Sequence, residues 1–236
     1  MARHLVLFAR EPAREAREKG FGGAEGAELF AAFAAGWAEA ARRVGARLVV
    51  ATPPEDRRAF ARRFEQAPIW LDQRGPTFGS RLERAARDAA CLPGRAILVG
   101  GDVVPDSARL LQAFEALEAG ADAAIVPASD GGVSLIGLAR EDLDLLGNLS
   151  LRRPDVCSDL CSALARRRRR VRVLDRTADV DGRRALRALS RATPRWTALA
   201  RQILRRAAPR AQSARRPRLH RPDRTLPILR APPRAA

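Results

Sequence analysis

The sequence predicts an α/β protein with a mostly parallel, doubly wound sheet and helices on both faces. Short apolar runs alternate along the chain with longer segments of helical periodicity, which is the rhythm of such a sheet. The runs, of which Ala96–Gly100 is the clearest, lack the alternation of a half-exposed strand and are typical of strands buried on both faces. Right-handed crossovers between parallel strands would place helices on both sides of the sheet.

The first half of the chain contains three of these apolar runs. The long segment that follows the first run is alanine-rich, and its leucine, phenylalanines and tryptophan recur at helical spacing, so we expect an amphipathic helix there. A later pair of prolines favours a helix start. In order, we expect a strand at Leu5–Ala9, a helix from Glu25 to about Val44, a strand at Arg47–Ala51, a helix start at Pro53-Pro54, a strand at Ile69–Leu71 and a helix from Phe78 to about Ala90.

The second half of the chain repeats the pattern and breaks it once. Two apolar runs are joined only through the turn Asp130-Gly131-Gly132, so one strand there is expected to be antiparallel. Ser107 is expected to cap the helix that it opens. In order, we expect a strand at Ala96–Gly100, a helix from Ser107 to about Glu118, strands at Ala123–Val126 and Val133–Leu138, a helix after Asp155 that ends in the run Arg166–Arg170, a strand at Val171–Leu174 and a helix from about Arg183.

Length and composition indicate one folded domain with a basic appendage. The chain has 236 residues, of which 46% are hydrophobic, and this suffices for a core. Residues 201–236 hold eleven arginines and one acid, and therefore carry +10 of the net charge of +17. We expect a domain at 1–208 and a disordered, Arg- and Pro-rich tail at 209–236. The tail has no aromatic residue, which suits it only to weak, non-specific polyanion binding.

Membrane, secretory and cysteine-based classes of protein are not favoured. No apolar run approaches the roughly 20 residues of a membrane span. The run after His4 is too short for a signal peptide, so we expect the cytoplasm. Cys157 and Cys161 stand four residues apart on an expected helix, and too few further ligands accompany them for a metal site, so they are interpreted as buried thiols.

Aspartates follow three of the expected strands, where open α/β sheets bind ligands. Asp102 comes after Gly100-Gly101, Asp130 precedes a second Gly-Gly pair, and Asp179 and Asp181 follow the last strand. Asp102 is a candidate ligand for Mg²⁺ or Mn²⁺, which prefer oxygen donors. Aspartates also stabilise turns and helix starts, so Asp102 and Asp130 as turn residues and Asp181 as an N-cap remain alternatives.

Cations after the first strand are candidates for phosphate binding. Arg10, Arg17 and Lys19 lie in the segment that usually meets the nucleotide in a doubly wound fold. Arg81, near the start of a helix, could also meet an anion. The alternative for all of them is a solvated, charged surface, since glutamates are interspersed. The segment fits neither the dinucleotide-binding fingerprint nor a P-loop.

Taken together, these motifs resemble a bacterial GT-A-like family of glycosyltransferases that was formerly a domain of unknown function. Its relatives include arsenosugar-biosynthesis glycosyltransferases and 2-phospholactate guanylyltransferases. The resemblance covers about residues 4–192. It rests on Leu7-Phe8-Ala9-Arg10 with Pro12, the helix from Gly26, Gly79 with Arg81-Leu82, Gly100 with Asp102, Asp130-Gly131-Gly132 with Leu135-Ile136-Gly137-Leu138, and Asp179-Val180-Asp181.

The resemblance implies a three-layer GT-A fold and a metal-dependent glycosyltransferase with a nucleotide-diphosphate-sugar donor. The acceptor stays open. It further implies that Asp102 and Asp181 bind the divalent metal, Mg²⁺ or Mn²⁺, and that Asp130 and Asp181 are catalytic. The donor would be bound by Ala9, Arg10, Arg17, Lys19, Arg81, Gly100 and Gly101.

Two alternatives stay open beside glycosyl transfer. One is a nucleotidyltransferase on the same scaffold. The other is a catalytically degenerate relative with a polyanion-binding tail, since the chain departs from the family pattern at several places. Gly101 stands where the family has a hydroxyl residue, Val104 where it has proline, and Val133 where an aromatic residue is common.

Overall fold

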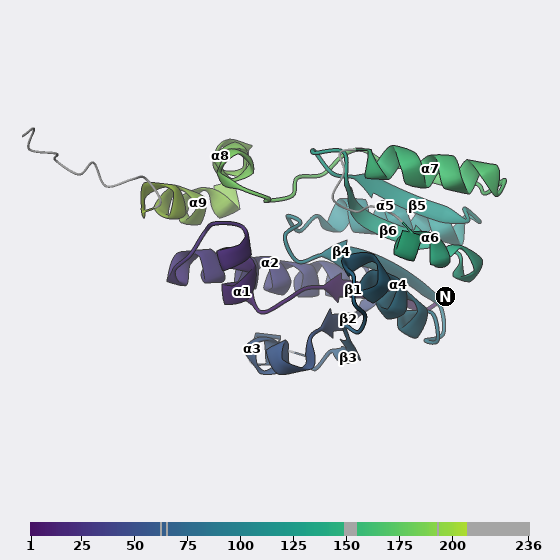
Figure 1. Ribbon diagram of the computed structural model, residues 1–236, viewed down its shortest axis with the longest axis horizontal. Coiled ribbons are helices and arrows are strands. Elements are labelled where there is room, and N and C mark those ends of the chain that lie inside the picture. Colours follow the sequence, from purple (N-terminus) through teal and green to yellow (C-terminus); the bar gives the residue numbers. More distant parts are fainter. Residues whose placement is uncertain (62, 65, 149–154, 193, 207–236) are drawn as a thin grey trace, which may run out of the picture.

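The computed structural model describes residues 1–61, 63–64, 66–148, 155–192 and 194–206 (Figure 1). The tail predicted at 209–236 lies outside these residues. The strands are β1 (Arg3–Phe8), β2 (Ala46–Thr52), β3 (Ile69–Asp72), β4 (Arg95–Gly100), β5 (Ala123–Pro127), β6 (Val133–Leu138) and β7 (Val171–Val173). The helices are α1 (Pro12–Glu18), α2 (Ala24–Arg43), α3 (Arg57–Ala61), α4 (Phe78–Ala89), α5 (Ser107–Glu118), α6 (Asp144–Asn148), α7 (Val156–Arg166), α8 (Arg183–Ala192) and α9 (Pro194–Arg206), with 3-10 turns at Pro54–Asp56 and Arg140–Asp142.

The strands form one seven-stranded sheet in the order β3-β2-β1-β4-β6-β5-β7. All neighbours are parallel except at β6, which runs antiparallel to both β4 and β5. The antiparallel strand predicted at the Asp130 turn is therefore confirmed. The chain leaves β1 toward β2, whereas β4 lies on the other side of β1, so the strand order reverses between β1 and β4. Such a reversal opens a crevice at the carboxyl ends of the two strands.

Helices cover both faces of the sheet, as Figure 1 shows. On one face, Trp37 of α2 and Phe114 of α5 pack with the side chains of Leu5 and Leu7 from β1. On the other face, α4, α6 and α7 pack against the alternate residues of the same strands, of which Val6 is one. Both faces of β1 are therefore buried, and the predicted three-layer α/β fold is confirmed.

The helix pair α8–α9 packs on α1 and α2, away from the sheet. Its core contains Leu186 of α8 and Trp196 of α9, which meet Phe21, Phe30 and Phe33. The rings of Phe33 and Trp196 lie edge to face with centroids 5.0 Å apart. This packing fixes α1 and the segment before α8, and both of these contribute side chains to the crevice.

The helix α5 begins at Ser107 as predicted, but its N-cap was placed one residue late. Asp106 is the N-cap of α5, and its Oδ1 accepts hydrogen bonds from the backbone N–H groups of Ala108 and Arg109, each at 3.0 Å. Ser107 is the first helical residue. Aspartate and serine are both good caps, so the sequence pattern did not separate two adjacent candidates.

None of the helices in the described part of the chain combines the length and the apolar character that a membrane crossing requires.

Candidate functional site

A cleft of about 860 Å³ lies at the carboxyl ends of β1 and β4, where the strand order reverses. Its walls come from α1 and the loop before it, the loop after β4, the β5–β6 hairpin, the start of α4 and the segment before α8. Glycines allow this close assembly. A Cβ on Gly100 would lie 2.7 Å from Oδ1 of Asp102, and one on Gly101 would lie 2.7 Å from Cβ of Ala9.

The segment before α8 crosses the ends of β5 and β4 and carries two aspartates into the cleft. Asp179 pairs with Val103 in an antiparallel bridge. The N–H of Val180 donates to the carbonyl of Asp102 at 3.0 Å, and the Val180 side chain is fully buried. Burial of Val180 directs its two neighbours the other way, so the carboxylates of Asp179 and Asp181 line the cleft.

Three carboxylates gather at this side of the cleft. One oxygen from each of Asp130, Asp179 and Asp181 lies within 4.8 Å of the others. Burial and the neighbouring charges of Asp130 and Asp181 raise the pKa of Asp179 to about 7. Oδ1 of Asp130 also accepts a hydrogen bond from the N–H of Gly132 at 2.9 Å, so Asp130 does stabilise its turn. Like charges held this close favour binding of a proton or a cation.

The ammonium of Lys19 lies between the carboxylates of the cleft. Its Nζ lies 2.5 Å from Oδ2 of Asp102, contacts Oδ1 of Asp181, and lies 3.9 Å from Oε1 of Glu15. Burial alone would lower the pKa of Lys19, but the charge and hydrogen bonds of Asp102 and Asp181 outweigh it and raise the pKa above its usual value. Lys19 is therefore a firmly protonated bridge between two of the aspartates.

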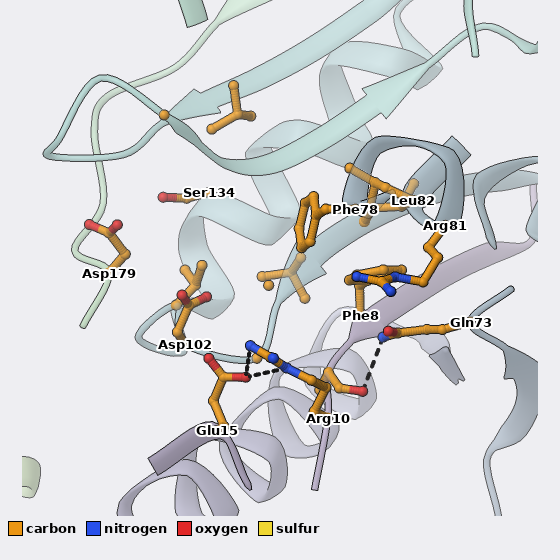
Figure 2. Close-up of a pocket in the computed structure, with 18 of the residues that line it drawn as sticks. Phe8, Arg10, Glu15, Gln73, Phe78, Arg81, Leu82, Asp102, Ser134 and Asp179 are labelled. Carbon is orange, nitrogen blue, oxygen red and sulfur yellow. Dashed lines mark hydrogen bonds and ion pairs between the residues drawn. The ribbon is translucent and has the colours of Figure 1, made fainter. Parts of the chain in front are cut away.

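Arg10 extends the charged network into the middle of the cleft (Figure 2). Its Nε lies 3.1 Å from Oε2 of Glu15, and a guanidinium nitrogen lies 3.3 Å from Glu18. Burial and the charge of Asp102 raise the pKa of Glu15, while Arg10 and Lys19 oppose this shift. Nearby, the side-chain amide of Gln73 donates to the carbonyl of Ala9 at 3.1 Å and fixes the loop after β1.

On the opposite side of the cleft lies Arg81, a cation that forms no ion pair with a carboxylate of the described residues. Figure 2 shows Asp102 and Asp179 on one side and Arg81 on the other. Within the described residues, Arg81 has no ion pair, and its Nε is buried without a hydrogen-bond partner. Arg81 lies in the first turns of α4, beside Phe78, whose half-exposed ring packs edge to face on Phe8 at 5.4 Å. This side is suited to an anion and a flat ring.

Like Nε of Arg81, the hydroxyl oxygen of Ser134 is a buried polar atom of the cleft without a hydrogen-bond partner in the described residues. Ser134 lies on β6, is 2% exposed and lines the cleft. Figure 2 shows this hydroxyl directed toward the side where Asp179 lies. A buried hydroxyl without a partner is costly, and a bound ligand could satisfy it.

Most of the residues proposed from the sequence for the site come together here. Those that line the cleft are Ala9, Arg10, Lys19, Arg81, Gly100, Gly101, Asp102, Asp130 and Asp181. Arg17 does not line the cleft, because it lies on the exposed side of α1. Sequence reasoning did not single out Glu15, Gln73, Phe78 or Ser134 as site residues. No pattern marks Gln73 or Ser134, whereas Glu15 precedes Lys19 by four residues, a spacing that could have suggested an ion pair.

The residues present fit a divalent cation. The donors are hard carboxylate oxygens, which Mg²⁺ and Mn²⁺ prefer. The ammonium of Lys19 already stands in for a cation between Asp102 and Asp181. The structure therefore divides the predicted pair of ligands. Asp181 belongs to the three-carboxylate cluster, whereas Asp102 does not and is joined to it through Lys19.

Comparison with known proteins supports the resemblance expected from the sequence. Residues 37–151 match the model of the family described as "Uncharacterized protein conserved in bacteria (DUF2064)". A protein from Desulfovibrio desulfuricans G20, provisionally designated a nucleotide-diphospho-sugar transferase, has 25% sequence identity and a TM-score of 0.75, over 88% of this chain and 99% of that chain. The predicted resemblance is thereby confirmed. No curated protein sequence matches the chain.

More distant structures share the fold alone. The inositol-1-phosphate CTP transferase of T. maritima has 11% identity and a TM-score of 0.56, over 86% of this chain and 96% of that chain. CMP:2-keto-3-deoxy-manno-octonic acid synthetase, solved with CTP, has 13% identity and a TM-score of 0.51, over 80% of this chain and 97% of that chain. The fold is therefore that of nucleotide-diphospho-sugar transferases and nucleotidyltransferases.

Proposed function

We propose that this protein is a metal-dependent glycosyltransferase with a nucleotide-diphosphate-sugar donor. The observation that carries the proposal is the division of the cleft. Asp102 and Asp179 lie on one side, where Asp130 and Asp181 gather with Asp179, whereas Arg10 lies in the middle and Arg81 on the other side (Figure 2). A diphosphate that spans the cleft would meet both sides. The designation of the Desulfovibrio protein, similar over nearly its whole length, supports the same class.

Each residue would then have a defined task. Arg81 binds the diphosphate, because it lines the cleft without an ion pair to a carboxylate among the described residues, and Arg10 joins it from the loop after β1. Asp102 and Asp181 hold the divalent ion, which would neutralise the charge that develops on the leaving diphosphate. Asp130 is proposed as a catalytic residue on the acceptor side, together with Asp181. Gly100 leaves room for the Asp102 carboxylate, and Gly101 lets the loop after β4 approach Ala9.

The test is a panel of UDP-, GDP-, CDP- and ADP-sugars, each with and without Mn²⁺. We expect one donor to raise the melting temperature of the protein only when Mn²⁺ is present, and the same donor to be hydrolysed slowly without acceptor. Asp102→Asn serves as the control variant and should lose the Mn²⁺-dependent shift. If no donor stabilises the protein with Mn²⁺, the proposed glycosyl transfer is wrong.

A nucleotidyltransferase on the same scaffold is the second candidate. Lys19 and Arg14 add cations beside Arg10, where a triphosphate would extend. The two more distant structures, which share the fold, are named as enzymes of CTP-dependent transfer and CMP-sugar synthesis. Release of pyrophosphate from a nucleoside triphosphate and a sugar 1-phosphate would identify this reaction. Glycosyl transfer would release a nucleoside diphosphate instead.

A further inference from the structure

Lys19 is the single lysine of the chain. Of the 44 lysine and arginine residues, all the others are arginine. Arginine presents a planar fork of donors, whereas lysine carries a compact ammonium on a flexible stem. A compact ammonium fits the space between the carboxylates of Glu15, Asp102 and Asp181, and the one lysine of the chain lies there.

The ammonium of Lys19 holds the two aspartates assigned above to the metal. It lies 2.5 Å from Oδ2 of Asp102 and also binds Asp181, while the Lys19 side chain is only 18% exposed. A divalent ion between these carboxylates would lie within a few ångströms of the ammonium, and such like charges repel strongly in a partly buried site. The ion and the ammonium therefore exclude each other from this position.

A second position is open to the ammonium when a diphosphate is bound. Lys19 is the C-cap residue of α1 and lines the same cleft as Arg10. Its stem has four rotatable bonds, so the ammonium can leave the aspartates without movement of the backbone. Phosphate oxygens in the cleft would replace the carboxylate contacts that it gives up.

On the basis of the proposed function, we infer that Lys19 couples metal binding to diphosphate binding. Its ammonium occupies Asp102 and Asp181 in the free protein, moves to the diphosphate when that binds, and so makes the two carboxylates available to the divalent ion. Lys19 is a positioning residue in this scheme. The coupling is reciprocal, so each ligand strengthens binding of the other. A lysine with a purely structural role would stabilise the fold without creating this dependence.

Mn²⁺ binding in the presence and absence of inorganic pyrophosphate tests the inference without knowledge of the donor. Free Mn²⁺ is measured by electron paramagnetic resonance, with its association with pyrophosphate in solution subtracted. Wild-type protein should bind Mn²⁺ weakly alone and more tightly with pyrophosphate. Lys19→Met should bind Mn²⁺ alone about tenfold more tightly than wild type and lose the dependence on pyrophosphate. Arg17→Met removes a charge from the exposed side of the same helix and should behave as wild type.

The outcomes separate this inference from the proposed function. If wild-type protein binds Mn²⁺ and Lys19→Met shows the same or lower affinity, or the same coupling, the inference is wrong and the function stands. If neither protein binds Mn²⁺ under any condition, both are wrong.

A second measurement needs no variant. Because the chain has one lysine, protein labelled with [ε-¹³C]lysine gives a single ε-methylene NMR signal. We expect pyrophosphate to shift this signal and Mg²⁺ alone to leave it in place. A signal that moves with Mg²⁺ alone, or that ignores pyrophosphate, would overturn the inference.

Discussion

The ammonium of Lys19 lies 2.5 Å from a carboxylate oxygen of Asp102, although 83 residues separate the two along the chain. The contact exists because β1 and β4 are neighbours in the sheet, so the segment after β1 meets the loop after β4. In the free protein it places a positive charge beside the carboxylate that we propose as a metal ligand. The behaviour of Asp102 therefore depends on what else binds Lys19.

Replacing Asp102 with asparagine should abolish transfer while leaving the fold intact. We expect the turnover rate to fall about 100-fold or more, as for loss of a charged group that acts on the reacting centre. The free energy of unfolding should change by less than about 1 kcal/mol, because the pair is partly exposed and Lys19 retains Asp181. Donor assays and urea unfolding measure the two effects. Asp88→Asn, on the exposed side of α4, is the matched control.

Replacing Arg81 with methionine should weaken binding of pyrophosphate about tenfold or more, because Arg81 has no competing carboxylate in the described part of the chain. Arg14→Met is the comparison. Arg14 also lines the cleft, but it lies 3.6 Å from Glu55 and 3.8 Å from Asp56, so its charge is already shared. We expect a loss of less than about threefold there. Calorimetric titration with pyrophosphate measures the affinity of each variant. Equal losses of affinity in Arg81→Met and Arg14→Met would contradict the assigned role of Arg81.

The sequence predicted the sheet and its main helices well where a segment showed a clear apolar run or a clear helical spacing. The strand Val133–Leu138 and the helix Ser107–Glu118 have the predicted limits, because apolar runs and helical spacing are local signals. The helix α1 was not predicted, since it is short and polar and most of its support comes from packing on α2. The helix α9 was not predicted either, and its buried Trp196 meets residues far away in the sequence.

The site was predictable as a set of candidates and not as an arrangement. Strand ends indicated Asp102, Asp130 and Asp181, and position after the first strand indicated Arg10 and Lys19. That Lys19 would bind two of those aspartates depends on a bridge between Val103 and Asp179 that no local pattern encodes. Ser134 reads as an ordinary strand residue, and only burial without a partner distinguishes it.

Replacing Ser134 with alanine should separate stability from ligand binding. Its buried hydroxyl has no partner in the described residues, so its removal should leave the free energy of unfolding unchanged or raise it by up to about 1 kcal/mol. Binding of the proposed donor with Mn²⁺ should weaken, because the ligand would lose a hydrogen bond. Ser190→Ala is the control. The Ser190 hydroxyl donates to the carbonyl of Arg187 at 2.8 Å, so this variant should lose about 1 kcal/mol of stability and bind normally.

His4 makes the stability of the protein depend on pH. It lies on β1, is 6% exposed, and its Nδ1 has no partner among the described residues. Burial, followed by the positive charge of Arg47 on β2, lowers the pKa of His4 in the folded protein. The unfolded chain therefore takes up this proton more readily than the folded protein does.

The sign of the effect follows from linkage. Stability from neutral His4 is fully present above the unfolded pKa of about 6.5 and is lost as the pH falls through the lowered pKa of the folded state. We expect the free energy of unfolding in urea to fall as the pH is lowered from about 7.5 to about 5. The free energy of unfolding of the His4→Asn variant should fall less over the same range. The difference between the two proteins isolates His4, because the raised pKa of Asp179 acts in the opposite direction and is common to both. Parallel curves would show that His4 titrates alike in the folded and unfolded states.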